Sequence, residues 1–74
     1  MLRNLGLKEK AGVIAGQIWE ALNGNEKGMT QKELKKATKL KTEKELFLGL
    51  GWLLREDKIE EKEDEAGELT FVLK

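Results

Sequence analysis

Two helix-start signals stand twelve residues apart, and they constrain the fold of this chain more than any other feature. Thr30 with Glu33, and Thr42 with Glu45, have the S/T-x-x-E spacing of a capping box. In this motif the hydroxyl and the carboxylate satisfy free backbone amides in the first turn of a helix. A three-residue turn, Lys39–Lys41, with a leucine at its centre lies between the two helices. Two helices joined this tightly are the layout of a helix-turn-helix.

An apolar face predicts another helix before this pair, over residues 8–24. Small and aliphatic side chains recur there at spacings of three and four, which places them on one side of a helix. Asn23 and Gly24 end it, because glycine adopts the left-handed cap conformation at little cost. Gly12 and Gly16 weaken the helix interior, so we expect another backbone to approach them, within the chain or across a dimer. The expected apolar face consists of Ala11, Ile14, Ala15, Ile18 and Leu22, with Trp19 at its edge.

The two helices of the helix-turn-helix are expected over about residues 31–38 and 43–56. The shorter one has only Leu34 and Ala37 to bury. On the longer one, helical spacing predicts a buried stripe of Leu46, Leu50, Leu53 and Leu54, with Phe47 on its edge. The opposite, outward arc is expected to hold Lys44, Glu45, Leu48, Trp52 and Arg55.

The C-terminal residues alternate between apolar and polar, which predicts a β-hairpin. Residues 58–62 and 68–74 are the expected strands, residues 64–67 are the turn, and Leu69, Phe71 and Leu73 share one face. Residues 25–30 are expected to form a loop. The predicted fold is therefore α+β: a winged helix-turn-helix of three helices plus a C-terminal β-hairpin wing, as a single domain over residues 1–74.

Three stretches resemble a known family. They are AGQIWEAL at residues 15–22, ELKKAT at residues 33–38 and LGLGWLLREDKI at residues 48–59. They are similar to the patterns AGxIWxxL, ELKKATG and LGWLxREGKI of small stand-alone winged helix-turn-helix proteins of bacteria and archaea, which are catalogued as a domain of unknown function. The resemblance implies a DNA-binding type of fold. Family members often have glycine where Lys39 and Asp57 stand here, so unusual backbone angles are expected at both positions.

Composition excludes several function classes. The chain has no cysteine and no histidine, which rules out the usual zinc sites, and no nucleophile stands beside a base. The acidic run at residues 60–65 lacks the spacing of a calcium loop. We therefore expect no enzyme, no cofactor, no metal and no small-molecule substrate. No long apolar run is present, so the expected location is cytoplasmic, without a membrane partner.

One function hypothesis is a nucleic-acid-binding or regulator-like module with weak affinity for double-stranded DNA. Lysines cluster around the predicted turn, where phosphates lie in a docked helix-turn-helix. Against this, the outward arc of the third helix has no asparagine or glutamine to read bases. Between Lys58 and Thr70 six acidic residues accompany two lysines. The candidate nucleic-acid-binding residues are Lys35, Lys36, Lys39, Lys41, Thr42 and Lys44.

The alternative is a protein-interaction or homodimerisation module that kept the fold but not DNA binding. Charge supports an oriented partner, because residues 1–41 carry a net charge of +5 and residues 42–74 a net charge of −5. Tryptophan is enriched in binding hot spots. Core packing competes with this interpretation: Trp52 under the hairpin on Leu69 or Phe71, and Trp19 beside Ile18. The candidate interface residues are Leu48, Trp52, Trp19, Gly12 and Gly16.

Overall fold

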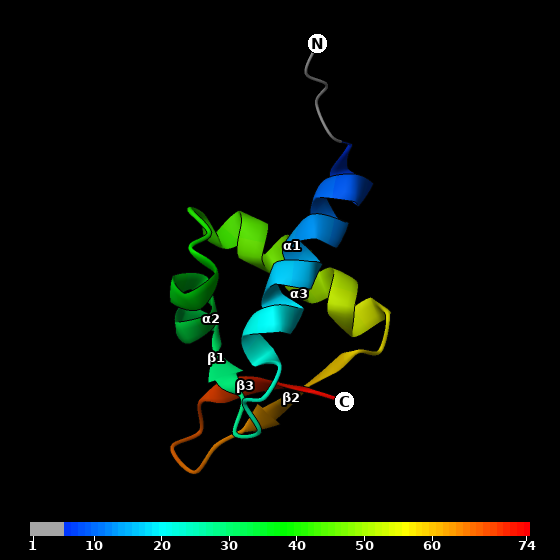
Figure 1. Cartoon of the computed structure of the whole chain (residues 1–74). Helices are drawn as coiled ribbons and strands as arrows, with labels where there is room; N and C mark the ends of the chain where they lie inside the picture. The colour runs from blue at the N-terminus through cyan, green and yellow to red at the C-terminus, as the bar shows by residue number, and fades with distance from the viewer. Residues whose placement is uncertain (1–5) are drawn as a thin grey trace.

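The computed structural model describes residues 6–74, and these form three helices stacked on one face of a small antiparallel sheet (Figure 1). The α+β winged helix-turn-helix prediction is confirmed. Residues 1–5 of the predicted domain lie outside the described part of the chain. Within the described part, no helix has the length and apolar character needed to cross a bilayer. The elements are α1 (Leu7–Leu22), β1 (Met29–Thr30), α2 (Gln31–Thr38), α3 (Glu43–Arg55), β2 (Ile59–Glu63) and β3 (Leu69–Leu73).

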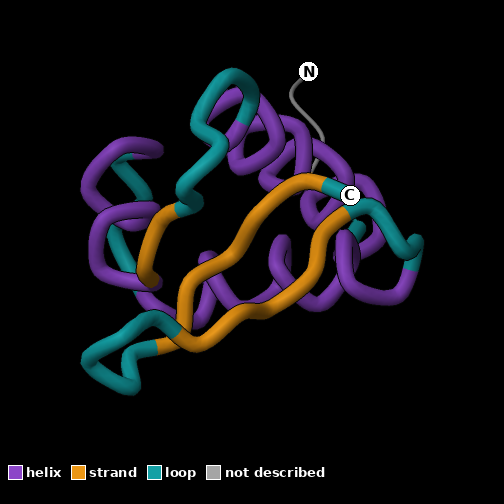
Figure 2. Tube along the Cα trace, turned by 90° about the horizontal axis from the view of Figure 1, so that it is seen from below, coloured by secondary structure: helices purple, strands orange, loops and turns teal. Residues whose placement is uncertain are grey.

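The sheet has the strand order β1-β3-β2, so β3 is its central strand. Figure 2 shows the three strands from below, in front of the helical layer. The β2–β3 hairpin, which we call the wing, was predicted, but β1 was not, since residues 25–30 were expected to form a loop. Two residues are too few to show an alternating pattern. Gly28, with φ of +82°, brings β1 beside β3, where Met29 pairs with Phe71.

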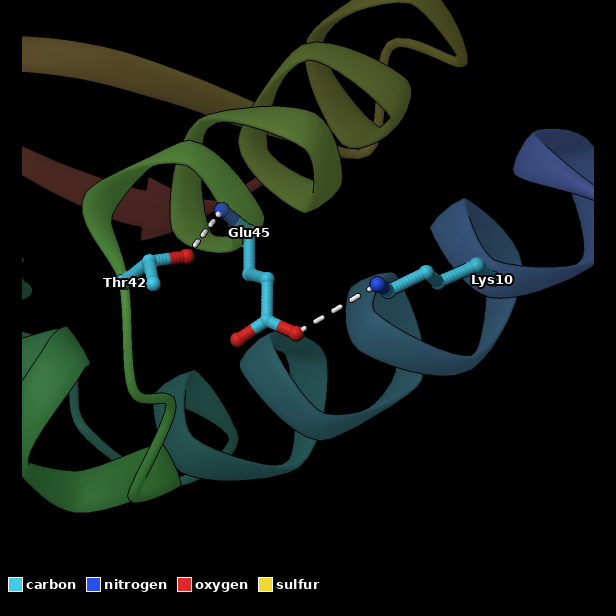
Figure 3. A network of polar contacts seen from close by, with 3 residues as sticks. All are labelled: Lys10, Thr42 and Glu45. Carbon is cyan, nitrogen blue, oxygen red and sulfur yellow. Dashed lines mark hydrogen bonds and ion pairs between the residues drawn. The ribbon is translucent and has the colours of Figure 1, made fainter.

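The two helix starts differ in their capping. At Thr30 the capping box is complete: its hydroxyl accepts from the Glu33 amide (3.1 Å), and the Glu33 carboxylate accepts from the Thr30 amide (2.9 Å). At Thr42 only the first half forms, with the Glu45 amide donating over 3.2 Å. The Glu45 carboxylate instead lies 3.5 Å from the ammonium of Lys10 (Figure 3). The second predicted box is thus half formed, because its carboxylate joins α3 to α1.

Within residues 6–74, two non-glycine residues have positive φ, and they stand at the expected positions. Lys39 has φ of 61° and Asp57 has φ of 62°, so the predicted unusual angles are confirmed. The left-handed conformation costs such residues roughly 1–2 kcal/mol. Asp57 also accepts a 2.7 Å hydrogen bond from Lys74, and this raises the pKa of the Lys74 ammonium. The pairing therefore stabilises the folded chain at any pH below the ordinary lysine pKa. This stabilisation is lost only in strongly alkaline solution, as the pH rises through the raised pKa of Lys74.

The rotation of α3 differs from the prediction. Its buried residues are Leu46, Gly49, Leu50 and Leu53, whereas Leu54 is 40% exposed and Phe47 is 50% exposed. Gly49 is the reason. A Cβ atom there would lie 2.5 Å from Cγ2 of Ile14 and 3.2 Å from the backbone N of Ala15. Because α3 meets α1 through this glycine, its buried arc shifts toward residue 49 and away from residue 54.

The rotation of α3 changes which side chains lie at the two edges of its buried face. Leu48 and Trp52, expected on the outward arc, are half-buried and pack against the core.

Two smaller predictions were also wrong. Ala37 is exposed, because α2 buries only Leu34. Trp19 is 37% exposed rather than packed in the core. The predicted face of α1 is confirmed, since Ala11, Ile14, Ala15, Ile18 and Leu22 are all buried.

Candidate functional site

A groove of about 800 Å³ opens between α2, α3 and the wing. We call it the α3–wing groove. Three large apolar side chains line it while remaining half exposed: Phe47 (50%), Leu54 (40%) and Leu69 (51%). Three of the large hydrophobic side chains that the described surface exposes therefore meet at one place. Contiguous apolar surface of this kind is typical of interaction sites.

The α3 side of the groove follows from helical spacing. Phe47, Gly51 and Leu54 stand at i, i+4 and i+7, so they share one face of α3. A Cβ atom at Gly51 would meet no atom within 4 Å. Gly51 therefore leaves open space between the phenylalanine and the leucine, and the groove reaches the backbone of α3.

The wing side of the groove follows from strand alternation. Leu69 lies two residues before Phe71 on β3, so both side chains project from the same face of the sheet. Phe71 is buried against the core, while Leu69 stands nearer the hairpin turn and is half exposed. The predicted shared face of Leu69, Phe71 and Leu73 agrees with this register. Val72, on the opposite face, is also buried, because Gly28 lies against it.

The rim of the α3–wing groove is charged, with opposite signs on different elements. Lys32 and Lys35 of α2 form what we call the basic rim, and Glu61 and Glu68 of the wing form the acidic rim. Glu43 adds a further carboxylate at the start of α3. Since α2 continues directly from β1, the strand order β1-β3-β2 places the α2 lysines and Glu61 of β2 on opposite sides of β3.

The predicted nucleic-acid-binding residues lie along the C-terminal half of α2, the turn and the start of α3. Lys36, Lys39, Lys41 and Lys44 are exposed, and we call them the turn lysines. Within residues 6–74, no carboxylate lies at ion-pair distance from their ammonium groups. Lys35 is half-buried at the α3–wing groove, and the Thr42 hydroxyl is engaged by the Glu45 amide.

Four of the five predicted interface residues converge elsewhere. Gly12, Gly16, Trp19 and Trp52 line a second groove, of about 310 Å³, between α1 and α3. A Cβ atom at either glycine would meet nothing within 4 Å, so the expected close approach of a backbone within the chain is wrong. Trp52 packs against the core and lines this groove beside α1, and it is not among the residues that line the α3–wing groove with Leu69 and Phe71. The fifth residue, Leu48, packs against the core.

The acidic hairpin shows no metal-binding geometry. Among the described residues, no three acidic side chains are close enough to hold a metal ion together. The carboxylates of the hairpin are exposed, and two of them, Glu61 and Glu68, form the acidic rim.

Comparison with known proteins agrees with this architecture. A family model described as a winged helix-turn-helix domain (DUF2582) matches residues 7–73, which is nearly the whole chain. The chain belongs to this family. The DUF2582 domain is also similar to the solution NMR structure of protein BT2368 from Bacteroides thetaiotaomicron, with a TM-score of 0.76 and 30% sequence identity. That match covers 89% of this chain and 77% of the other. No curated protein matches the DUF2582 domain.

Sequence reasoning did not find the α3–wing groove of this DUF2582 domain. It placed Phe47 and Leu54 at or near the buried stripe and treated Leu69 as an inward-facing strand residue. A signal was present in the two glycines of α3, at positions 49 and 51. Only one of them faces α1, and which one it is decides the face that α3 exposes.

Proposed function

We propose that this DUF2582 domain is a protein-interaction module whose contact surface is the α3–wing groove, and that α3 does not read DNA sequence. The supporting observation is that half-exposed Phe47, Leu54 and Leu69 meet on this surface. Fully burying such a side chain contributes about 1.5–3 kcal/mol. A partner that covers all three therefore gains enough to offset part of the cost of association.

The chemistry of α3 argues against base reading. Specific recognition uses side-chain donors and acceptors on base edges, and each good bidentate pair is worth about 1–3 kcal/mol of discrimination. Between Phe47 and Leu54 the exposed surface of α3 offers an aromatic ring, a glycine and a leucine. The wing that would rest on the DNA backbone has a net charge of −4 between residues 58 and 70. Phosphates would be repelled on that side.

The turn lysines support a second candidate function, a weak contact with the DNA backbone. Their ammonium groups are exposed and outside the ion pairs of the described chain. Four phosphate contacts give a log-affinity slope of about −3.6 against log salt concentration. Such binding is independent of sequence and weak at physiological salt. It uses the α2–α3 turn and leaves the α3–wing groove uncovered.

Titration of the amide-correlation NMR spectrum with a mixed-sequence DNA duplex, at about 50 and 200 mM salt, distinguishes the two uses. We expect any shifts to lie at the turn lysines and to fade at the higher salt. The amides of Phe47, Gly51, Leu54 and Leu69 should not move. A Lys39/Lys41/Lys44→Glu variant should abolish the shifts, whereas Lys27→Glu, in the α1–β1 loop, should preserve them. Shifts in the groove amides that persist at 200 mM salt would contradict the proposal.

A further inference from the structure

We propose that the partner of the α3–wing groove is the same groove of a second copy of this chain, related by a two-fold axis. This inference rests on the proposed function and names its partner. It starts from the arrangement of charge around the apolar floor. The basic rim (Lys32 and Lys35) belongs to α2 and the acidic rim (Glu61 and Glu68) to the wing. Strand β3 separates Glu61 of β2 from the α2 side, and Glu68 directly precedes Leu69 of β3.

A rim of two signs selects its partner. A polyanion such as DNA is attracted by the lysines and repelled by the glutamates, and a purely basic partner meets the reverse. A partner with both signs, separated by an apolar strip, satisfies the whole rim. A second copy of the chain carries the same basic and acidic rims on either side of the same apolar strip. Interfaces with two-fold symmetry require such self-complementarity.

A two-fold axis that runs along the apolar floor, in the plane between the copies, places the basic rim of each copy opposite the acidic rim of the other. The same operation places Phe47 and Leu54 of one α3 against the corresponding side chains of the other copy. Apolar contact then lies at the centre and ion pairs at the edge, as in most protein interfaces.

The size of the surface sets the expected strength. A standard interface buries about 800 Å² per partner, which is roughly a seventh of the 5692 Å² that the chain exposes. Three half-exposed apolar anchors make this a contact at the weak end of that range. The expected dissociation constant is therefore on the order of tens of micromolar.

A charge-swap experiment tests the second copy directly. One variant carries Lys32→Glu and Lys35→Glu; the other carries Glu61→Lys and Glu68→Lys. In either variant alone, like charges face each other on both sides of the axis, so self-association measured by sedimentation equilibrium should weaken about 10- to 100-fold. In an equimolar mixture every rim again meets its opposite. The mixture should form a heterodimer with an affinity within about threefold of the wild-type homodimer.

Matched controls separate rim pairing from net charge. Lys39→Glu with Lys41→Glu, and Glu63→Lys with Glu65→Lys, make the same charge changes outside the residues that line the groove. These variants should associate like the wild type at about 150 mM salt. Lys32, Glu61 and Glu68 are exposed and Lys35 is half-buried at the groove, so none of the substitutions enters the core and the variants should fold. If one does not, Leu69→Asn on the exposed wing provides a second test, with at least a tenfold loss of association expected.

Three results would overturn the inference: a wild-type chain that stays monomeric to about 1 mM, rim variants that associate as the wild type does, or a mixture that fails to re-associate. If the chain stays monomeric and its groove amides do not shift when DNA is added, the second copy is rejected and the protein-interaction proposal stands. Groove amides that respond to DNA reject both.

Discussion

Replacing Gly49 by alanine should lower the free energy of unfolding by about 1–2 kcal/mol, whereas the same change at Gly51 should raise it by up to about 1 kcal/mol. The two glycines are two residues apart in one helix, so their intrinsic helix propensities are equal. Their surroundings differ. We expect the two changes in the free energy of unfolding to have opposite signs, because α3 contacts α1 at Gly49 and faces open space at Gly51.

The loss at Gly49 comes from overpacking. Its added Cβ would lie 2.5 Å from Cγ2 of Ile14, 2.7 Å from Cδ1 of Ile18 and 3.2 Å from the backbone N of Ala15. The Ile14 methyl is on a β-branched carbon with little rotamer freedom in a helix, so the helices must separate. Overpacking of this kind costs about 1–3 kcal/mol, and better helix propensity offsets up to about 1 kcal/mol of it.

The gain at Gly51 comes from helix propensity alone, since nothing lies within 4 Å of its Cβ position. Thermal unfolding of both variants measures the difference, because 1 kcal/mol moves the midpoint by about 4–8 °C in a domain of this size. Equal effects at the two positions would show that α3 is not rotated as described. The exposed positions of Phe47 and Leu54 would then be wrong as well.

Gly28→Ala should have the largest effect, a loss of about 2–4 kcal/mol in the free energy of unfolding. Gly28 has φ of +82°, which strains any residue with a Cβ. The added atom would also lie 2.6 Å from the carbonyl oxygen of Phe71 and 2.5 Å from Cγ1 of Val72. Backbone atoms of a central strand cannot move aside cheaply, so β1 must separate from β3.

Gly67→Ala is the matched control for this substitution. Gly67 has φ of +84° but no atom within 4 Å of its Cβ position, so only strain of about 1 kcal/mol is expected. Urea unfolding compares the two, and faster amide exchange at the Thr30–Thr70 pairing should accompany Gly28→Ala alone. Equal losses for the two variants would mean that β1 does not depend on the contact with β3.

The sequence predicts the fold well where local signals decide it. Capping at Thr30, the apolar face of α1 and the hairpin were all recognisable, because each depends on residues close in the chain. The positive φ at Lys39 was expected from the family resemblance. The strand β1 was not predicted, since it depends on Gly28 meeting a strand more than forty residues away. A strand of two residues is too short to show an alternation of apolar and polar side chains, so its pairing with a distant strand leaves no sequence pattern.

The candidate site was harder to predict, because it depends on how α3 is rotated. Spacing alone gave Leu46, Leu50 and Leu53 as buried, and they are. It cannot tell whether Leu54 or Gly49 completes the stripe, since that depends on how closely α1 approaches. With Gly49 inside, Leu48 and Trp52 pack against the core, and Phe47 and Leu54 line the groove. A rotation by part of a turn thus exposes Phe47 and Leu54 on α3 and leaves Leu48 and Trp52 half-buried.

We infer that the α3–wing groove binds a second copy of this chain, and the wild-type protein tests this inference without any substitution. Amide-correlation spectra recorded from about 20 µM to about 1 mM should change progressively with concentration. We expect reversible shifts centred on Phe47, Gly51, Leu54 and Leu69, extending to the rim at Lys35 and Glu61. Spectra that stay constant over the whole range, or shifts confined to the groove of Gly12, Gly16 and Trp19, would contradict it.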